Sequence, residues 1–396
     1  MKNFLVLGII SLTIAIGSQN LVYGNPAVPA APRPFNDITA AQLVSNIRVG
    51  WNLGNSLEAN DHGAGWMPRN ADITQMETGW QNPVTTRANI DAIKNAGFNA
   101  IRIPVTWTKA ASPAPDYTIR ADWIARVVEV VNYAVSNDMY IILNTHHDEE
   151  SVFGFLNSDA AAGQAAFRRV WQQIADTFKN YDEKLIFEGL NEPRTVGSAN
   201  EWTGGTSAER RNLNTYYQIF VDTVRASGGN NDKRILMVNT YAAWHTAAAV
   251  NELALPRDTT ANKLIVSFHL YVPVEFTYNF SHLNSTNRWS NTNRSDTSPI
   301  TTIIDRFYNR FVRNGVPVII GEFGSMNKNN TAARAAWTEF VARTAWNRGI
   351  KCFIWDNGLI ETRVDFEGGE GHGLLNRANN TFPYQEIINA LMNGTR

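Results

Sequence analysis

Short apolar runs alternate with longer amphipathic stretches along most of the chain. Continuous apolar runs are typical of parallel strands buried on both faces, whereas apolar positions every three or four residues, as in 123–135 and 165–178, indicate helices with one buried face. The strand-like runs lie at 48–53, 100–105, 140–147, 185–192, 234–240, 264–271, 317–323 and 351–356. This regular alternation predicts an α/β fold, namely a (β/α)8 TIM barrel.

One domain accounts for residues 35–396, since barrels of this kind routinely exceed about 250 residues and we expect no second domain after the helix predicted at 383–393. Residues 1–24 combine Lys2, an apolar stretch at 4–16 and a small residue, Gly24, which is typical of a secretory signal peptide. Residues 25–34 are rich in Pro and Ala and read as an extended leader. We therefore expect a secreted, extracellular protein.

Two glutamates stand at the ends of apolar runs, Glu192 after LIFEGLN and Glu322 in VPVIIGEFG. The carboxyl ends of barrel strands share one rim, where barrel enzymes place their chemistry. An eight-stranded ring with strands ~4.8 Å apart and tilted ~36° places the fourth and seventh strands ~14 Å apart, which leaves ~6 Å between two inward Glu carboxylates. That gap is closer to the roughly 5–5.5 Å of retaining glycosidases than to most of the inverting range. The pair predicts a secreted glycoside hydrolase.

Further polar and aromatic residues end the other runs and should gather at the same rim. Each one alone also has a structural explanation, but the whole set favours a binding cleft. The candidates are Asn52, Arg102, His146, His147, Asn191, His269, Tyr271 and Trp355. Inserts at 54–82, 193–206 and 273–297 follow strands on this face and should shape the cleft, with Glu58, His62 and Trp66 in the loop 57–67 as a candidate glycone-side wall.

Composition narrows the possible partners. The formal net charge is −1, and no run of like charges occurs, so we expect no nucleic acid partner. The apolar stretch near the start is too short to cross a bilayer, so we expect no membrane partner. Among the 12 Trp, some can stack on sugar rings. We expect a monomer that acts on a polysaccharide without a cofactor or a metal.

Two other functions remain open from the residues. A metal-dependent hydrolase on the same barrel would use His146, His147, Asp148 and Glu192, although neighbouring strand residues point to opposite faces and suit one ion poorly. A carbohydrate-binding protein without activity would need the aromatic cleft but not both carboxylates.

The motifs as a group resemble glycoside hydrolase family five of clan A, over essentially all of the predicted mature chain. They are IRIP (101–104), NTHHD (144–148), FEGLNEP (187–193), SFHLY (267–271), IIGEFG (319–324) and FIWDNG (353–358). WNLGNSLE (51–58) and GEGHGLLNR (369–377) are similar to the subfamily of many endo-β-1,4-glucanases and xyloglucanases, and especially to secreted endoglucanases of anaerobic rumen fungi. The segment 272–279 departs from the small polar run expected there, which puts the acceptor-side contacts in question.

The resemblance implies the role of each site residue. Glu192 would be the acid/base and Glu322 the nucleophile of a retaining mechanism. Apolar surroundings and the charge of Glu322 should raise the pKa of Glu192. Arg102 and Tyr271 would align Glu322, Asn191 would bind the sugar 2-OH and His269 would orient Glu192. His146, His147 and Asn52 would bind substrate, and Trp355 would form the floor.

The expected substrate is β-1,4-glucan, cut internally. Xyloglucan, mannan, xylan and mixed-linkage glucan remain alternatives, since similar chains act on each of them and loop shape decides among them.

Overall fold

The computed structural model describes residues 33–154, 160–278, 285–363 and 369–396. Its centre is a closed barrel of eight parallel strands in sequence order, so the predicted (β/α)8 fold is confirmed. Every strand is almost wholly buried, in keeping with the continuous apolar runs. The strands are β1 (Gly50–Asn52), β2 (Ala100–Ile103), β3 (Tyr140–Asn144), β4 (Leu185–Glu188), β5 (Leu236–Asn239), β6 (Leu264–Leu270), β7 (Val318–Phe323) and β8 (Lys351–Ile354).

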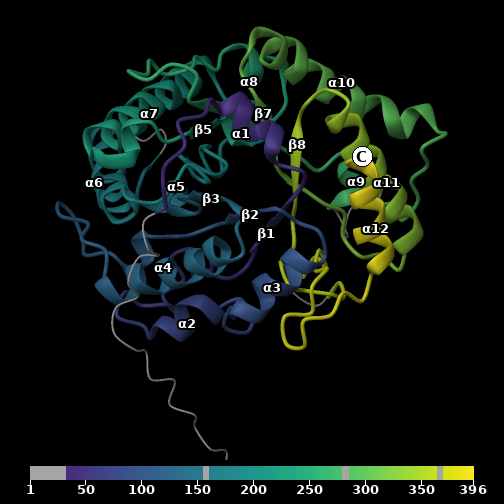
Figure 1. Cartoon of the computed structure of the whole chain (residues 1–396), viewed down its shortest axis with the longest axis horizontal. Helices are drawn as coiled ribbons and strands as arrows, with labels where there is room; N and C mark the ends of the chain where they lie inside the picture. Colours follow the sequence, from purple (N-terminus) through teal and green to yellow (C-terminus); the bar gives the residue numbers. More distant parts are fainter. Residues whose placement is uncertain (1–32, 155–159, 279–284, 364–368) are drawn as a thin grey trace, which may run out of the picture.

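Helices surround the strands, with α4, α6 and α7 on one side of Figure 1 and α10, α11 and α12 on the other. The helices predicted at 123–135, 165–178 and 383–393 correspond to α4, α6 and α12. The helices are α1 (Ala40–Asn46), α2 (Ile73–Thr78), α3 (Arg87–Asn95), α4 (Ala121–Ser136), α5 (Asp148–Ser151), α6 (Ala160–Phe178), α7 (Ser207–Ala226), α8 (Ala247–Asn251), α9 (Val274–Thr277), α10 (Arg294–Arg310), α11 (Thr331–Trp346) and α12 (Gln385–Gly394).

The barrel has two apolar cores, one inside the ring and one between the ring and its helices. The outer core contains the apolar stripes of the helices, such as Trp123, Val127 and Val131 of α4. The inner core is closed at one end by α1, whose Ala40, Leu43 and Val44 belong to the same cluster as residues of the strands. The strand residues of that cluster are Ala100, Ile142, Ile186, Ile235, Met237, Ile265, Ile319 and Phe353.

Most strands end before the boundary that the hydrophobic pattern predicts, and the difference is largest in β3 and β4. β4 ends at Glu188, so Asn191 and Glu192 lie in the turn that follows, and β3 ends at Asn144, before His146 and His147. The apolar run continues beyond β4 because Leu190 is buried in the core although it is no longer part of the strand. The predicted strand boundaries at 140–147 and 185–192 are therefore too long.

A β-bulge lies in β7 beside Glu322. The register with β6 shifts so that Phe268 pairs with Ile320 but His269 pairs with Glu322, which leaves Gly321 as the extra residue. A Cβ at Gly321 would lie 2.7 Å from Oγ of Ser267, so a side chain at this position would force its surroundings to shift. Bulges of this kind redirect a side chain next to an active site.

Several predicted segments lie wholly or partly outside the described residues. The signal peptide at 1–24 and most of the leader at 25–34 are among them, as is part of the insert 273–297. Within the described part of the chain, the helices are all too short or too polar to cross a membrane.

Candidate active site

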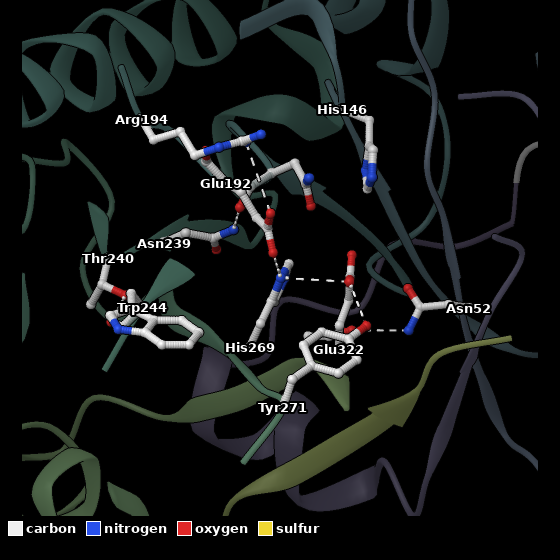
Figure 2. Close-up of polar contacts among 12 residues, drawn as sticks. Asn52, His146, Glu192, Arg194, Asn239, Thr240, Trp244, His269, Tyr271 and Glu322 are labelled. Atoms are coloured by element: carbon white, nitrogen blue, oxygen red, sulfur yellow. Dashed lines mark hydrogen bonds and ion pairs between the residues drawn. The ribbon is translucent and has the colours of Figure 1, made fainter. Parts of the chain in front are cut away.

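The two glutamates singled out by the sequence meet at the carboxyl end of the barrel. One carboxylate oxygen from each of Glu192 and Glu322 and one ring nitrogen of His269 all lie within 4.8 Å of one another. Nδ1 of His269 is 2.7 Å from Oε1 of Glu192 and 3.6 Å from Oε2 of Glu322, so the histidine of β6 stands between the two acids (Figure 2). The spacing of the carboxylates fits that of retaining glycosidases, which is roughly 5–5.5 Å.

Glu322 is held from both sides by donors. Nη1 of Arg102 donates to its Oε1 at 2.7 Å, and the hydroxyl of Tyr271 donates to its Oε2 at 2.9 Å. Burial raises the pKa of Tyr271 well above its ordinary value, as does the charge of Glu322, so Tyr271 keeps its proton and remains a donor. Charge-assisted hydrogen bonds of this kind are shorter and stronger than neutral ones. Glu322 is therefore presented as a carboxylate of fixed orientation.

Arg102 of β2 is fully buried and ties four strand ends together. In addition to Glu322, it donates to Glu188 at 2.6 Å, to Asn52 at 3.0 Å and to Asn191 at 2.8 Å. Burial alone would lower the pKa of Arg102, but the charges of Glu188 and Glu322 raise it. Such planar multiple bonding is a property of arginine that lysine cannot reproduce.

Glu192 is positioned through the backbone of its turn. The carboxylate of Glu149 in α5 accepts the amide N–H of Asn191 at 3.0 Å and that of Glu192 at 2.6 Å. Asn239, the last residue of β5, donates to the carbonyl oxygens of Leu190 and Asn191. Burial raises the pKa of Glu149 well above its ordinary value. Side chains of α5 and β5 therefore hold the backbone of this turn in place.

The pKa of Glu192 departs from the expectation of a raised value. Burial does raise it, but the hydrogen bond with His269 and the positive charges of His269 and Arg194 outweigh that effect and lower the pKa below its ordinary value. The sequence could not reveal this because it shows neither the 2.7 Å contact nor the position of Arg194.

Aromatic side chains border the carboxylates. His146 and the half-buried Trp355 stack with centroids 6.1 Å apart, and His146 packs edge to face with His147 at 4.6 Å. Figure 2 shows Trp244 on the opposite side of the carboxylates from His146, and its ring is 6.2 Å from that of Trp202. Burial lowers the pKa of His146 well below its ordinary value, so this ring is neutral. Rigid aromatic faces beside polar groups suit the binding of sugar rings.

The structure joins seven of the ten predicted site residues in one network of hydrogen bonds and ion pairs, namely Asn52, Arg102, Asn191, Glu192, His269, Tyr271 and Glu322. Asn52 and Arg102 lie fully buried beneath the carboxylates and bond protein atoms. His146, His147 and Trp355 form the aromatic border. The ring of His147 also forms a hydrogen bond with Glu150 at 3.0 Å.

Other residues of the site escaped the sequence interpretation. Glu188, Glu149, Asn239 and Arg194 all contact it. Glu188 and Asn239 could have been found as an acid and an amide at strand ends, whereas the contacts of Glu149 and Arg194 arise from the fold. One candidate of the loop wall is wrong. Glu58 is fully buried, and its carboxylate accepts the backbone N–H groups of Asn55 and Ser56.

The four residues of the metal alternative do not converge. Asp148 is buried and accepts the backbone N–H groups of Trp107 and Thr108, while His147 binds Glu150. Among the described residues, the group compact enough for an ion is Glu192, His269 and Glu322, the same three groups that the hydrolytic reading uses.

Comparisons with known proteins agree with this geometry. Residues 58–359 match the family described as Cellulase (glycosyl hydrolase family 5). The chain belongs to glycosyl hydrolase family 5. It is 43% identical over 362 residues to the cellulase/esterase CelE of Acetivibrio thermocellus and 41% identical over 356 residues to endoglucanase A of Clostridium longisporum, covering 91% and 90% of this chain. The chain spans 41% of the length of the first relative and 66% of the second.

Among solved structures, a family 5 subfamily 4 broad specificity endoglucanase from Ruminococcus champanellensis with bound cellotriose is similar to this chain with a TM-score of 0.85 and 45% identity. The match covers 91% of this chain and 100% of that one. Together these relatives confirm the family and the endoglucanase subfamily that the motifs predicted.

Proposed function

We propose that this family 5 protein is a retaining endo-β-1,4-glucanase that hydrolyses internal bonds of cellulose and related β-glucans. The observation that carries the proposal is the approach of Glu192 and Glu322 to within 4.8 Å on the two sides of His269. Two carboxylates at this spacing leave no room for the water that an inverting mechanism places between sugar and base. Glu322 therefore attacks the sugar itself.

In the first step, an oxygen of Glu322 forms a bond to the anomeric carbon while the bond from that carbon to the glycosidic oxygen breaks. Glu192 gives its proton to the departing oxygen, which leaves as the hydroxyl of the shortened chain. The product is a glycosyl ester of Glu322. Arg102 and Tyr271 support this step because they hold the attacking carboxylate in place.

In the second step, Glu192 acts as a base. It takes a proton from water as the water oxygen bonds to the anomeric carbon, and the ester bond to Glu322 breaks. The anomeric carbon has been inverted twice, so its configuration is retained, and both glutamates return to their starting states.

His269 links the two protonation states of Glu192. In the free enzyme, the 2.7 Å hydrogen bond between Nδ1 of His269 and Glu192 stabilises the ionised carboxylate. A glucan chain that fills the cleft removes water, and a drier site disfavours a separated pair of charges. Substrate binding therefore moves the shared proton to Glu192, where the first step needs it.

Several features support a glucan substrate and secretion. Figure 2 shows His146 and Trp244 on opposite sides of the carboxylates, and each ring has an aromatic neighbour, Trp355 and Trp202 respectively, which suits a chain that extends in both directions. A related broad specificity endoglucanase has been solved with cellotriose bound. The signal-like residues 1–24 support secretion. Asn191 would bind the 2-OH of the sugar at the cleavage point, and Trp355 would stack beneath it.

The test is product analysis on five polymers, namely cellulose, mixed-linkage glucan, xyloglucan, mannan and xylan. We expect a rapid fall in viscosity of the β-glucans with few reducing ends released, and a β-anomer as the first product by proton NMR. An α-anomer as the first product, or preference for mannan or xylan, would contradict the proposal.

Two controls separate the alternatives. Glu322→Ala should abolish hydrolysis but leave glucan binding intact, whereas wild type that binds glucan and releases no reducing ends would indicate a binding protein. Activity should withstand dialysis against a chelator. Loss of activity that zinc restores would instead assign Glu192, His269 and Glu322 to a metal.

A further inference from the structure

Arg194 lies two residues after Glu192 and folds back over it. Its Nη1 donates to the backbone carbonyl of Glu192 at 3.1 Å and lies 3.9 Å from Oε2 of the Glu192 carboxylate. Figure 2 shows the guanidinium on one side of this carboxylate and His269 on the other. The arginine side chain is 11% exposed, so solvent screens the contact only weakly.

The guanidinium is fixed before any substrate arrives. Nη2 donates to Glu150 at 3.0 Å, Nε donates to Glu201 at 2.9 Å, and the group lies 4.7 Å from the centroid of the Trp202 ring. Glu150 is in turn bound by His147. Arg194 thus reaches Glu192 from a position set by three other residues, which is the condition for precise support of a catalytic group.

The two oxygens of Glu192 face different partners. Oε1 lies 2.7 Å from His269, whose charge depends on a proton, whereas Oε2 faces the permanent charge of Arg194. Burial would lower the pKa of Arg194, but Glu192, Glu150 and Glu149 raise it, so the guanidinium stays charged throughout the cycle.

Charged and titratable groups surround Glu192 on several elements. Arg194 and His269 favour its ionised form, while the acids nearby favour its protonated form. The groups that face it are Arg194 of its own turn, His269 of β6, Tyr271 and Tyr278 after β6, Glu322 of β7, and Glu149 and Glu150 of α5.

We propose that Arg194 is a positioning residue for Glu192. Arg194 faces Oε2 of the Glu192 carboxylate and stabilises the ionised form of Glu192 for the second, hydrolytic step. This inference rests on the proposed role of Glu192 as acid/base. It assigns a task to the charge directly after the NEP motif, which none of the predicted roles covers.

The test is the pH dependence of kcat/KM for Arg194→Gln on an aryl cellotrioside with a poor leaving group. The alkaline limb of this profile reports loss, from the free enzyme, of the proton that Glu192 shares with His269 and later uses as the acid. Removing the positive charge raises the pKa of Glu192, so we expect the limb to move up by about one pH unit. Arg194→Lys keeps the charge and should leave the limb within about half a pH unit of wild type.

Arg210→Gln is the matched control. Arg210 of α7 is 8% exposed and also bonds a carboxylate, Glu252, and backbone carbonyls, but none of its contacts belongs to the site. We expect this variant to lose stability without any shift of the limb. Thermal unfolding of all three variants identifies any effect that comes from misfolding.

A dinitrophenyl leaving group needs no protonation, so with that substrate the alkaline limb should vanish in wild type and variants alike. If the limb remains, Glu192 is not the acid, and the proposed function fails. The role of Glu192 stands if the alkaline limb vanishes with the dinitrophenyl substrate. The assignment of Arg194 is then still wrong in either of two cases. In the first, Arg194→Gln does not shift the limb measured with the poor leaving group; in the second, Arg194→Lys shifts that limb as far as Arg194→Gln does.

Discussion

At the scale of single residues, the site depends on side chains that never meet the substrate. Arg102 is fully buried and bonds Glu188, Glu322, Asn52 and Asn191 at once. Buried charges of this kind are costly unless every partner is present. The same residue therefore contributes to both stability and catalysis, and the two contributions cannot be separated by removing it.

Arg102→Lys should lower the free energy of unfolding by about 3–5 kcal/mol, because a point charge leaves Glu188 or Glu322 buried without its partner. Urea unfolding measures the change. Arg343→Lys is the control, since Arg343 of α11 pairs with Glu339 at the surface and should change stability by less than about 0.5 kcal/mol. Equal losses in the two variants would contradict this account of Arg102.

Tyr271→Phe should separate the alignment of Glu322 by the Tyr271 hydroxyl from the packing of the Tyr271 ring. The change removes the hydroxyl that donates to Glu322 at 2.9 Å but keeps the ring. Hydrogen bonds to charged groups contribute about 1.5–3 kcal/mol, so we expect kcat to fall by roughly 10- to 100-fold with little change in the melting temperature. An unchanged kcat would show that Arg102 alone aligns Glu322.

At the scale of elements, the bulge of β7 turns a buried strand into a support for Glu322. Gly321 is the extra residue, and its carbonyl accepts a hydrogen bond from Asn52 at 3.0 Å. A regular strand would place successive side chains on opposite faces without this shift. The position of Glu322 therefore depends on a backbone irregularity next to it.

Gly321→Ala should reduce both stability and activity, since its Cβ would lie 2.7 Å from Oγ of Ser267. We expect a loss of about 1–3 kcal/mol from this overpacking. Ser267→Ala removes the opposing hydroxyl, which is buried and has no hydrogen-bond partner within the described residues. The double variant should thus recover most of the loss. If the double variant recovers no stability, the backbone at Gly321, and not its contact with Ser267, excludes the alanine side chain.

The strands and the residues around them show which parts of the fold and of the site could be predicted from the sequence. Apolar runs located all eight strands, because parallel strands in a barrel are buried on both faces. They could not show where β4 ends, since Leu190 stays in the core after the strand has stopped. Glu149 and Arg194 were missed for a different reason. Their contacts with the turn at Glu192 arise from the fold, and no short spacing in the sequence encodes them.

At the scale of the whole molecule, stability and chemistry lie at opposite ends of the barrel. Helix α1 closes the inner core at one end, and the carboxylates stand at the carboxyl ends of the strands. Barrel enzymes in general divide these tasks between the two faces. Substitutions at the closed end should therefore change stability alone.

Leu43→Ala tests this division. Leu43 of α1 is fully buried in the inner core, so its truncation should lower the free energy of unfolding by about 2–5 kcal/mol. Below the unfolding transition, kcat per folded molecule should equal that of wild type. A large fall in kcat would show that packing at the closed end determines the geometry of Glu192 and Glu322.

The most direct measurement of the central claim is the capture of the covalent intermediate. In a 2-deoxy-2-fluoro cellobioside, the fluorine destabilises the oxocarbenium-like transition states of both steps and removes the 2-OH interaction. An activated leaving group keeps the first step fast, so the glycosyl-enzyme accumulates. Mass spectrometry should then show one added disaccharide, and peptide mapping should place it on Glu322. A sugar on any other residue, or no adduct from an enzyme that still hydrolyses glucan with inversion, would contradict the account.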